Sequence, residues 1–206
     1  MNRTKTWVEW FCSTPQGKYF VQIDQNFIRD GFNFYGLRQY IQSNYKYAVE
    51  MIRDNYAPDN QRNGDIPQDV KKSDVEKSAI RLYGLLQARY LTTLNGLKEI
   101  KKKYQNHVFE ACPRVSCNKV CCLPYGVSEE PDDHALKMYC PCCREVYTAE
   151  DEIFSNIDGA YFGHSYLLVF LQIYPEFVKT PIKTELKLFG FRIELDDESE
   201  SESEVE

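Results

Sequence analysis

The apolar positions in the first hundred residues recur with the spacing of amphipathic helices. Between positions 27 and 37 they form short groups separated by glycines: Phe27, Ile28, Phe32, Phe34 and Leu37. This pattern predicts several short helices rather than one long helix. Residues 43–55 predict a further helix, because Tyr47 and Met51 lie at helical spacing. The polar stretch 57–67 contains Pro and Gly and is predicted to be a loop.

Two more helices are predicted before residue 106. Ser73 and Glu76 have the form of a capping box, so we expect a helix to begin at Ser73. Its buried face is expected to hold Ala79, Leu82, Leu86 and Tyr90. A second helix is expected from about residue 93 to residue 104. Its apolar face would carry Leu94, Leu97 and Ile100.

The pattern changes near residue 108, where Pro, Gly, Cys and aromatic residues become frequent. Short β-strands are predicted at 135–139, 146–148 and 160–162. The apolar run 166–173 fits a buried strand and a buried helix equally well, because periodicity does not separate the two. Near the end of the chain, apolar residues occupy every second position: they are Phe189, Phe191, Ile193 and Leu195. This period of two predicts a strand or an extended recognition segment.

Charge is distributed unevenly along the chain. The last eleven residues, 196–206, hold seven carboxylates and no basic residue, and without them the formal net charge of −6 becomes +1. We expect this tail to be disordered, because it is too charged to be buried. The nearly neutral remainder does not favour nucleic acid as a partner, since dedicated nucleic-acid binders carry a strongly basic surface.

No membrane segment is predicted from the sequence. Its first residues lack an apolar leader, and no apolar run approaches the ~20 residues of a membrane span. Eight cysteines without a secretion signal favour a reducing compartment, where thiols bind metals instead of forming disulfides. A cytoplasmic and nuclear protein without a membrane partner is therefore expected.

Four cysteines form two pairs with the spacing of a structural zinc site. Cys112 and Cys117 are separated by four residues, Cys140 and Cys143 by two, and 22 residues lie between the pairs. Each pair lies at a predicted turn, so the four thiolates can converge on one ion. The sequence therefore predicts one structural zinc per chain, in a closed tetrahedral site that leaves no position for a catalytic water.

The remaining cysteines offer alternative ligands. Cys142 competes with Cys143, but the two-residue spacing makes the turn that directs both sulfurs to one ion. Cys12, Cys121 and Cys122 are interpreted as ordinary thiols, with Cys121 or Cys122 as the chief rival for a ligand position. The sequence contains no metalloprotease, nucleophile-elbow, P-loop or zinc-deaminase motif, so an enzyme is not expected.

Six motifs in collinear order resemble the casein kinase II regulatory (beta) subunit family. They are Trp7–Cys12, Leu82–Tyr90, Cys112–Cys117, Leu136–Cys143, Asp158–Gly163 and Leu188–Phe191. The resemblance implies a protein that is not itself a kinase. It also implies a homodimer, formed through the zinc module, that bridges two catalytic subunits into a heterotetramer and modulates the choice of protein substrates.

The resemblance implies roles for two groups of residues. The zinc ligands would be Cys112, Cys117, Cys140 and Cys143. The segment that docks the catalytic subunit would contain Leu188, Phe189, Phe191 and Ile193, with Phe189 and Phe191 as the aromatic pair of a hairpin. The family usually has tyrosine at the position of Phe189, so the chain lacks one hydroxyl there.

Two regulatory features of the family differ in this sequence. The serine and acidic residues usual at the N-terminus are missing, and the acidic loop is diluted by basic residues, so effects of polyamines are left open. Ser199, Ser201 and Ser203 each have a glutamate three residues on, as an acidophilic kinase prefers. We hypothesise that they replace the lost phosphorylation site, although the tail also fits a simple solubilising segment.

Together these features predict an α+β fold. It would comprise an α-helical domain at 5–106, a four-cysteine zinc-ribbon dimerisation module at 107–178, a kinase-docking segment at 179–195 and an acidic tail at 196–206. The expected function is that of a non-catalytic regulatory subunit of an acidophilic Ser/Thr kinase. The alternative is a zinc-ribbon adaptor in a transcription complex or another nucleic-acid complex.

Overall fold

The computed structural model describes residues 5–53, 70–182, 187–189 and 191–192. Within these ranges, helices and a small antiparallel sheet form the α+β fold that the sequence predicts. The predicted loop at 57–67 lies outside the described residues, as does the acidic tail. No helix in the described part of the chain combines the length and the apolar character needed to cross a membrane.

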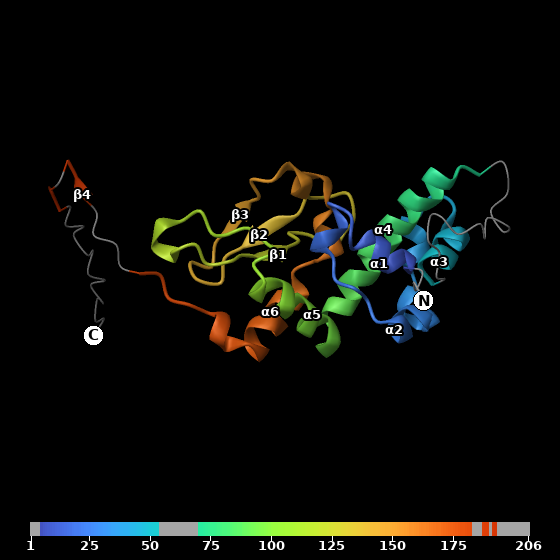
Figure 1. The fold of residues 1–206 in the computed structure, drawn as a ribbon, viewed down its shortest axis with the longest axis horizontal. Coiled ribbons are helices and arrows are strands. Elements are labelled where there is room, and N and C mark those ends of the chain that lie inside the picture. Colours follow the sequence, from blue (N-terminus) through green and yellow to red (C-terminus); the bar gives the residue numbers. More distant parts are fainter. Residues whose placement is uncertain (1–4, 54–69, 183–186, 190, 193–206) are drawn as a thin grey trace, which may run out of the picture.

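Short helices come first along the chain and the longer helices follow, in the order that the sequence pattern predicts (Figure 1). The α-helices are α1 (Trp7–Phe11), α2 (Gln25–Arg29), α3 (Tyr45–Arg53), α4 (Lys72–Leu91), α5 (Leu94–Gln105) and α6 (Ser165–Ile173). The 3-10 helices are η1 (Gly17–Tyr19), η2 (Gly31–Phe34), η3 (Leu37–Tyr40), η5 (Val115–Cys117), η6 (Glu152–Asn156), η7 (Gly159–Tyr161) and η8 (Pro175–Phe177).

A capping box is present, but not where the sequence pattern places it. Helix α4 begins at Lys72 and its N-cap residue, Lys71, makes no side-chain hydrogen bond, so Ser73 lies inside the helix and the prediction of its cap is wrong. The box lies at α1 instead. There the hydroxyl of Thr6 accepts from the backbone N–H of Glu9, and the Glu9 carboxylate accepts from the N–H of Thr6.

Helix α4 holds an extended segment of the chain through two polar side chains one turn apart. Tyr83 donates its hydroxyl to the carbonyl of Val21 at 2.7 Å and accepts from the N–H of Ile23 at 3.1 Å. Gln87 accepts from the N–H of Val21 at 2.7 Å and donates to the carbonyl of Tyr161 at 3.0 Å. Both side chains are fully buried, and each satisfies backbone groups that no sheet or helix pairs.

Aromatic side chains join the helical end of the molecule to the part that contains the sheet. Gly84 allows the ring of Tyr161 to lie directly on α4, because a Cβ at this position would meet the ring at 2.3 Å. The ring of Phe20 contacts those of Tyr161 and Phe162, with centroids 6.0 and 5.7 Å apart. One hydrophobic core therefore crosses the predicted boundary at residue 106.

Helices α5 and α6 pack together through aromatic rings. Tyr104 of α5 lies 6.4 Å from Phe170 of α6 between ring centroids, and 4.8 Å from Phe177. The expected apolar face of α5 is correct for Leu97 and Ile100, but Leu94 is 65% exposed. The ambiguous run at 166–173 is a helix, α6.

Three short strands form an antiparallel sheet in the order β1–β2–β3. They are β1 (Leu123–Tyr125), β2 (Lys137–Tyr139) and β3 (Val146–Thr148). Strands β2 and β3 match two predicted strands. The strand predicted at 160–162 is wrong, because Asp158 caps a 3-10 turn there by accepting from the N–H of Ala160.

Candidate metal centre and docking segment

The first cysteine pair lies on a loop that turns back on itself. The N–H of Cys112 donates to the carbonyl of Val120 at 2.7 Å, and the N–H of Cys117 donates to the carbonyl of Arg114 at 3.0 Å. Asn118 and Lys119 follow with left-handed backbone angles, φ 48° and 55°. These two residues reverse the chain directly after Cys117, so both sulfurs point to the same side of the loop.

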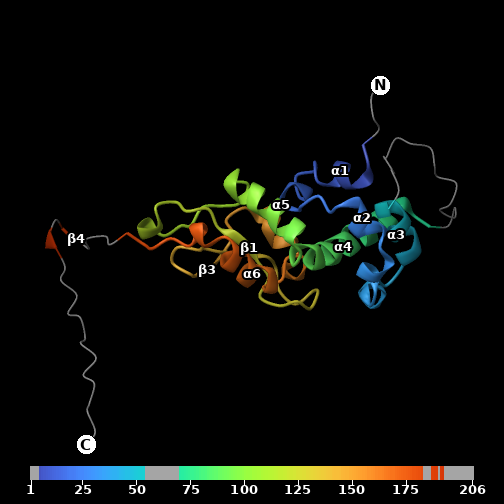
Figure 2. The same cartoon turned by 90° about the horizontal axis from the view of Figure 1, so that it is seen from below.

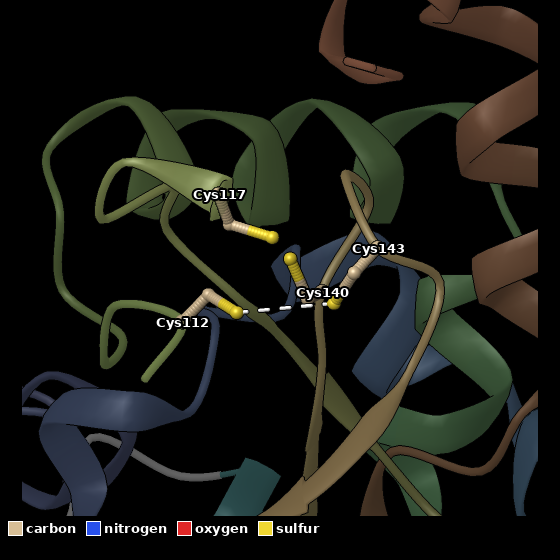
Figure 3. Close-up of side chains that lie close together, drawn as sticks. All are labelled: Cys112, Cys117, Cys140 and Cys143. Atoms are coloured by element: carbon tan, nitrogen blue, oxygen red, sulfur yellow. Dashed lines mark hydrogen bonds between the residues drawn. The ribbon is translucent and has the colours of Figure 1, made fainter. Parts of the chain in front are cut away.

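The second cysteine pair occupies the turn between β2 and β3. Cys140 and Glu145 close this turn, with the N–H of Cys140 donating to the carbonyl of Glu145 at 3.0 Å. The N–H of Arg144 donates to the carbonyl of Cys140 at 2.9 Å, and Arg144 has a left-handed φ of 63°. The hairpin thereby aims Cys140 and Cys143 at the first pair (Figure 3).

The four sulfurs form one compact group. Those of Cys112, Cys117, Cys140 and Cys143 all lie within 4.8 Å of one another. The sulfurs of Cys112 and Cys143 are 3.9 Å apart. Tetrahedral zinc with Zn–S bonds of about 2.3 Å requires sulfurs about 3.8 Å apart. The donor set and its spacing therefore fit a tetrahedral metal ion with four thiolate ligands.

The other cysteines do not join this group. The structure leaves Cys142 out, with its N–H donating to the sulfur of Cys140 at 3.4 Å. Cys121 donates its thiol to backbone carbonyls and Cys12 lies against Tyr83. Burial raises the pKa of Cys12 and Cys121 to about 11 and that of Cys122 to about 12, so all three are thiols at neutral pH.

The four grouped thiols differ in their electrostatic surroundings. Burial raises the pKa of Cys112, Cys117 and Cys140. Burial also opposes ionisation of Cys143, but hydrogen bonds from the Tyr147 hydroxyl and the backbone at Glu145 outweigh it and lower the pKa to about 6. Cys143 is thus the thiol most ready to bind a metal as thiolate.

Tyr147 is a site residue that the cysteine spacing does not reveal. Its hydroxyl oxygen lies 3.2 Å from Sγ of Cys143. It stands on β3, opposite Met138 of β2, four residues after Cys143. A hairpin prediction at 137–148 could have placed Tyr147 near the turn, but not its hydroxyl on one of the sulfurs.

The predicted docking segment forms a small hairpin, as the family resemblance implies, and not the single strand that its apolar alternation suggests. Strand β4 (Lys187–Leu188) pairs with β5 (Phe191–Arg192), and Phe189 lies in the turn with φ 50°. The side chains of Phe189 and Phe191 are 92% and 78% exposed. Ile193 lies outside the described residues, as do Ser199, Ser201 and Ser203.

The comparisons with known proteins identify the family. The model of the casein kinase II regulatory subunit family matches residues 6–192. The chain belongs to this family. It is therefore a non-catalytic regulatory subunit that associates with catalytic kinase subunits, and the comparisons do not support the alternative of a nucleic-acid adaptor.

Relatives of this regulatory subunit occur in fungi and animals. The chain is 38% identical to casein kinase II subunit beta of Schizosaccharomyces pombe, over 91% of this chain and 78% of that protein. It is 37% identical to casein kinase II subunit beta-2 of Neurospora crassa, over 91% and 64% of the two chains. It is 33% identical to casein kinase II subunit beta' of Drosophila melanogaster, over 91% and 84%.

Proposed function

We propose that this regulatory subunit dimerises through a zinc-loaded module and holds two catalytic subunits with its C-terminal hairpins. In this assembly the zinc folds the dimerisation surface, and the hairpin supplies the contacts to the kinase. The pair of exposed rings on the β4–β5 hairpin is the observation that carries the proposal.

The metal in this proposal is zinc. Four thiolates in a closed tetrahedral arrangement form a common structural zinc site, whereas a catalytic site keeps one position open. The ligands would be Cys112, Cys117, Cys140 and Cys143, which the fold of the two loops brings together. Bound zinc would hold the two loops as one rigid surface.

The exposed apolar residues of the zinc module support the dimer. Val115 lies between two of the cysteines and is 84% exposed, and Ile182 is 60% exposed. The two lie near each other, because the N–H of Ile182 donates to the carbonyl of Ser116 at 2.8 Å. Apolar side chains exposed together on a folded surface are typical of an interface.

The exposed rings of the hairpin support its docking role. Aromatic side chains are the commonest anchors at protein interfaces, because they bury much apolar area at small entropic cost. Phe189 and Phe191 have no such burial within the described part of the chain. A groove on the catalytic subunit would give them that burial.

Two sets of substitutions test the division of labour. Cys143→Ser should release zinc and lose the dimer, because structural zinc contributes on the order of 10 kcal/mol of folding free energy. Phe189→Ala with Phe191→Ala should keep the dimer and zinc but weaken kinase binding by several kcal/mol, about a hundredfold or more. Native mass spectrometry of the chain, alone and with a catalytic subunit, reports zinc, dimer and kinase together.

Each half of the proposal can fail separately. A metal-loaded dimer of the Cys143→Ser variant would refute the ligand assignment. Unchanged kinase affinity of the double phenylalanine variant would refute the docking role.

We also propose that the acidic tail is a phosphorylation site of the assembled kinase. Ser199, Ser201 and Ser203 each precede a glutamate by three residues, which suits a kinase that binds acidic residues through a basic site. The test is to incubate the assembled kinase with ATP and to map phosphate on the regulatory chain. Absence of phosphate at all three serines would refute the proposal.

A further inference from the structure

A groove with basic walls lies between η3 and α3, in the helical end of the molecule. Its volume is about 790 Å³. Arg38 contributes from η3, and Lys46 and Arg53 contribute from α3. Glu50 is the one carboxylate among the described residues that line it, so the groove carries a formal charge of +2.

The exposed cations of this groove have no anionic partner among the described residues. Elsewhere in the described ranges, ion pairs engage Lys77, Arg81, Lys101 and Lys102. Arg38 and Lys46 are exposed and take part in none of these pairs. Their charges are therefore available to an anionic ligand.

Arg53 is held in a fixed position at the groove. Its Nε donates to the carbonyl of Ile28 at 3.1 Å, and its guanidinium lies over the ring of Phe34 at 4.7 Å from the centroid. These contacts fix the side chain through Nε and one face of the guanidinium. A positioned guanidinium loses little entropy on binding a carboxylate, because its orientation is already set.

The remaining polar groups of the groove are also hydrogen-bond donors. The amide of Asn44 and the hydroxyl of Tyr47 line the groove, and no side-chain hydrogen bond engages either of them in the part of the chain that the structure describes. Together with Arg38 and Lys46, they present several donors to one ligand. An ionised carboxylate accepts hydrogen bonds and donates none, so it matches this wall.

We propose that this groove docks an extended acidic segment of a protein substrate. The inference rests on the proposed function in one respect, since an acidophilic kinase acts on segments rich in carboxylates. A peptide fits better than a nucleic acid, because Tyr45 and Val49 add an apolar wall that side chains of a peptide can contact. The chain without its tail also has a net charge near zero, and this disfavours binding to the phosphates of a nucleic acid.

The groove lies far from the other sites of the chain. In both views of the fold, α3 and the β4 strand lie at opposite ends of the molecule, with the sheet between them (Figures 1 and 2). A segment bound at α3 therefore leaves the metal centre and the docking hairpin free. The regulatory subunit could hold a substrate at one end and the catalytic subunit at the other.

The test uses the full regulatory chain and a fluorescent twelve-residue peptide with one serine followed by glutamates and aspartates. Fluorescence anisotropy measures its binding, and the same peptide with Gln and Asn in place of the acidic residues is the control ligand. Lys46→Glu should weaken binding of the acidic peptide about tenfold, and Arg38→Gln about threefold. Lys98→Glu makes the same charge change on the exposed surface of α5 and should alter binding less than twofold.

Several outcomes would overturn the proposal. Equal weakening by Lys98→Glu and Lys46→Glu would show a general charge effect instead of a docking site. Equal binding of the neutral peptide would remove the role of the carboxylates. Single-stranded DNA is the competitor. The groove would be assigned to nucleic acid if the DNA displaced the peptide and if Lys46→Glu weakened binding of the DNA as much as binding of the peptide.

A second measurement separates this proposal from the proposed function. The assembled kinase with Lys46→Glu should show a KM for an acidic protein substrate raised about tenfold, with kcat unchanged. Capture of the catalytic subunit should be unaffected, because the groove is remote from the hairpin. Normal capture by the unsubstituted assembly without binding of the acidic peptide would contradict the groove alone. Normal capture by the Phe189→Ala, Phe191→Ala assembly, with peptide binding intact, would contradict the docking role of the hairpin alone.

Discussion

At the scale of single residues, Tyr147 is the clearest case of a side chain that acts through another. Its hydroxyl lies 3.2 Å from Sγ of Cys143, and a thiolate only accepts hydrogen bonds, so Tyr147 donates to the ionised sulfur. Such contacts to metal ligands commonly change metal affinity by about 10- to 100-fold. We predict that Tyr147→Phe accelerates zinc release about tenfold, as measured with a chromogenic chelator.

A neighbouring tyrosine provides the control for this prediction. Tyr125 belongs to the same sheet, and its hydroxyl makes no hydrogen bond to a cysteine within the described residues. Tyr125→Phe should release zinc at the rate of the unsubstituted chain. Equal rates in all three proteins would show that the Tyr147 hydroxyl does not stabilise the bound thiolate.

Gln87 shows how one buried side chain can join separate parts of the fold. Its amide satisfies the N–H of Val21 and the carbonyl of Tyr161, both of them buried. Gln87→Leu would leave two backbone groups without partners, and we predict a loss of about 3 kcal/mol in the free energy of unfolding. Urea denaturation measures it. The exposed Gln22 is the control, and Gln22→Leu should cost less than about 0.5 kcal/mol.

At the scale of elements, the sequence pattern predicts the helices and strands whose positions follow from local periodicity. Helices α4 and α5 and strands β2 and β3 fall within one or two residues of the predicted positions. Strand β1 is missed because Pro124 stands at its centre, which is acceptable only because β1 pairs on one side, with β2. The hairpin at the C-terminal end is implied by the family resemblance, but the alternation of apolar residues alone does not reveal it, because Phe189 turns with a positive φ.

The functional sites also differ in how far the sequence predicts them. The four cysteines are predictable because the spacing of each pair makes its own turn, and the two turns need only meet. The groove at α3 is not predictable from spacing. Arg38 and Arg53 are fifteen positions apart, and only the packing of η3 against its neighbours brings them to one cavity.

Helix α4 is also tied to the loop before β2 by an ion pair. Arg81 donates from two nitrogens to the two carboxylate oxygens of Asp132, at 2.7 and 2.6 Å. The hydrogen bond from Arg81 lowers the pKa of Asp132 below its ordinary 3.8. The pair therefore adds stability above about pH 4, and this contribution is lost as the pH falls through the lowered pKa.

Asp132→Asn tests this contact. The Asp132 side chain is 70% exposed, so solvent screening limits the expected loss at pH 7 to about 0.5 kcal/mol. The loss should disappear in urea titrations near pH 2, where Asp132 is protonated and is as uncharged as the asparagine that replaces it. A difference of the same size at pH 7 and pH 2 would show that the effect is not electrostatic.

At the scale of the whole molecule, one core joins the helical end to the metal-binding part. Buried residues from Trp7 to Phe170 belong to a single hydrophobic cluster, which also contains Cys112, Cys117 and Cys140. The predicted division at residue 106 remains a prediction about sequence organisation. Across this division, Phe20 packs on Phe162, and Gly84 packs on the ring of Tyr161. The two parts should therefore lose their structure together.

Removal of the metal tests this cooperativity. Structural zinc contributes on the order of 10 kcal/mol, which is comparable to the whole net stability of a domain, so a strong chelator should lower the Tm by about 15 °C or more. Because α4 shares its core with the zinc module, the far-UV helical signal and the near-UV aromatic signal should disappear at the same temperature. The Phe189→Ala, Phe191→Ala variant is the control, since its exposed rings add nothing to the core and its Tm should be unchanged. A helical signal that keeps its original midpoint after chelation would show that the helices fold independently of the metal centre.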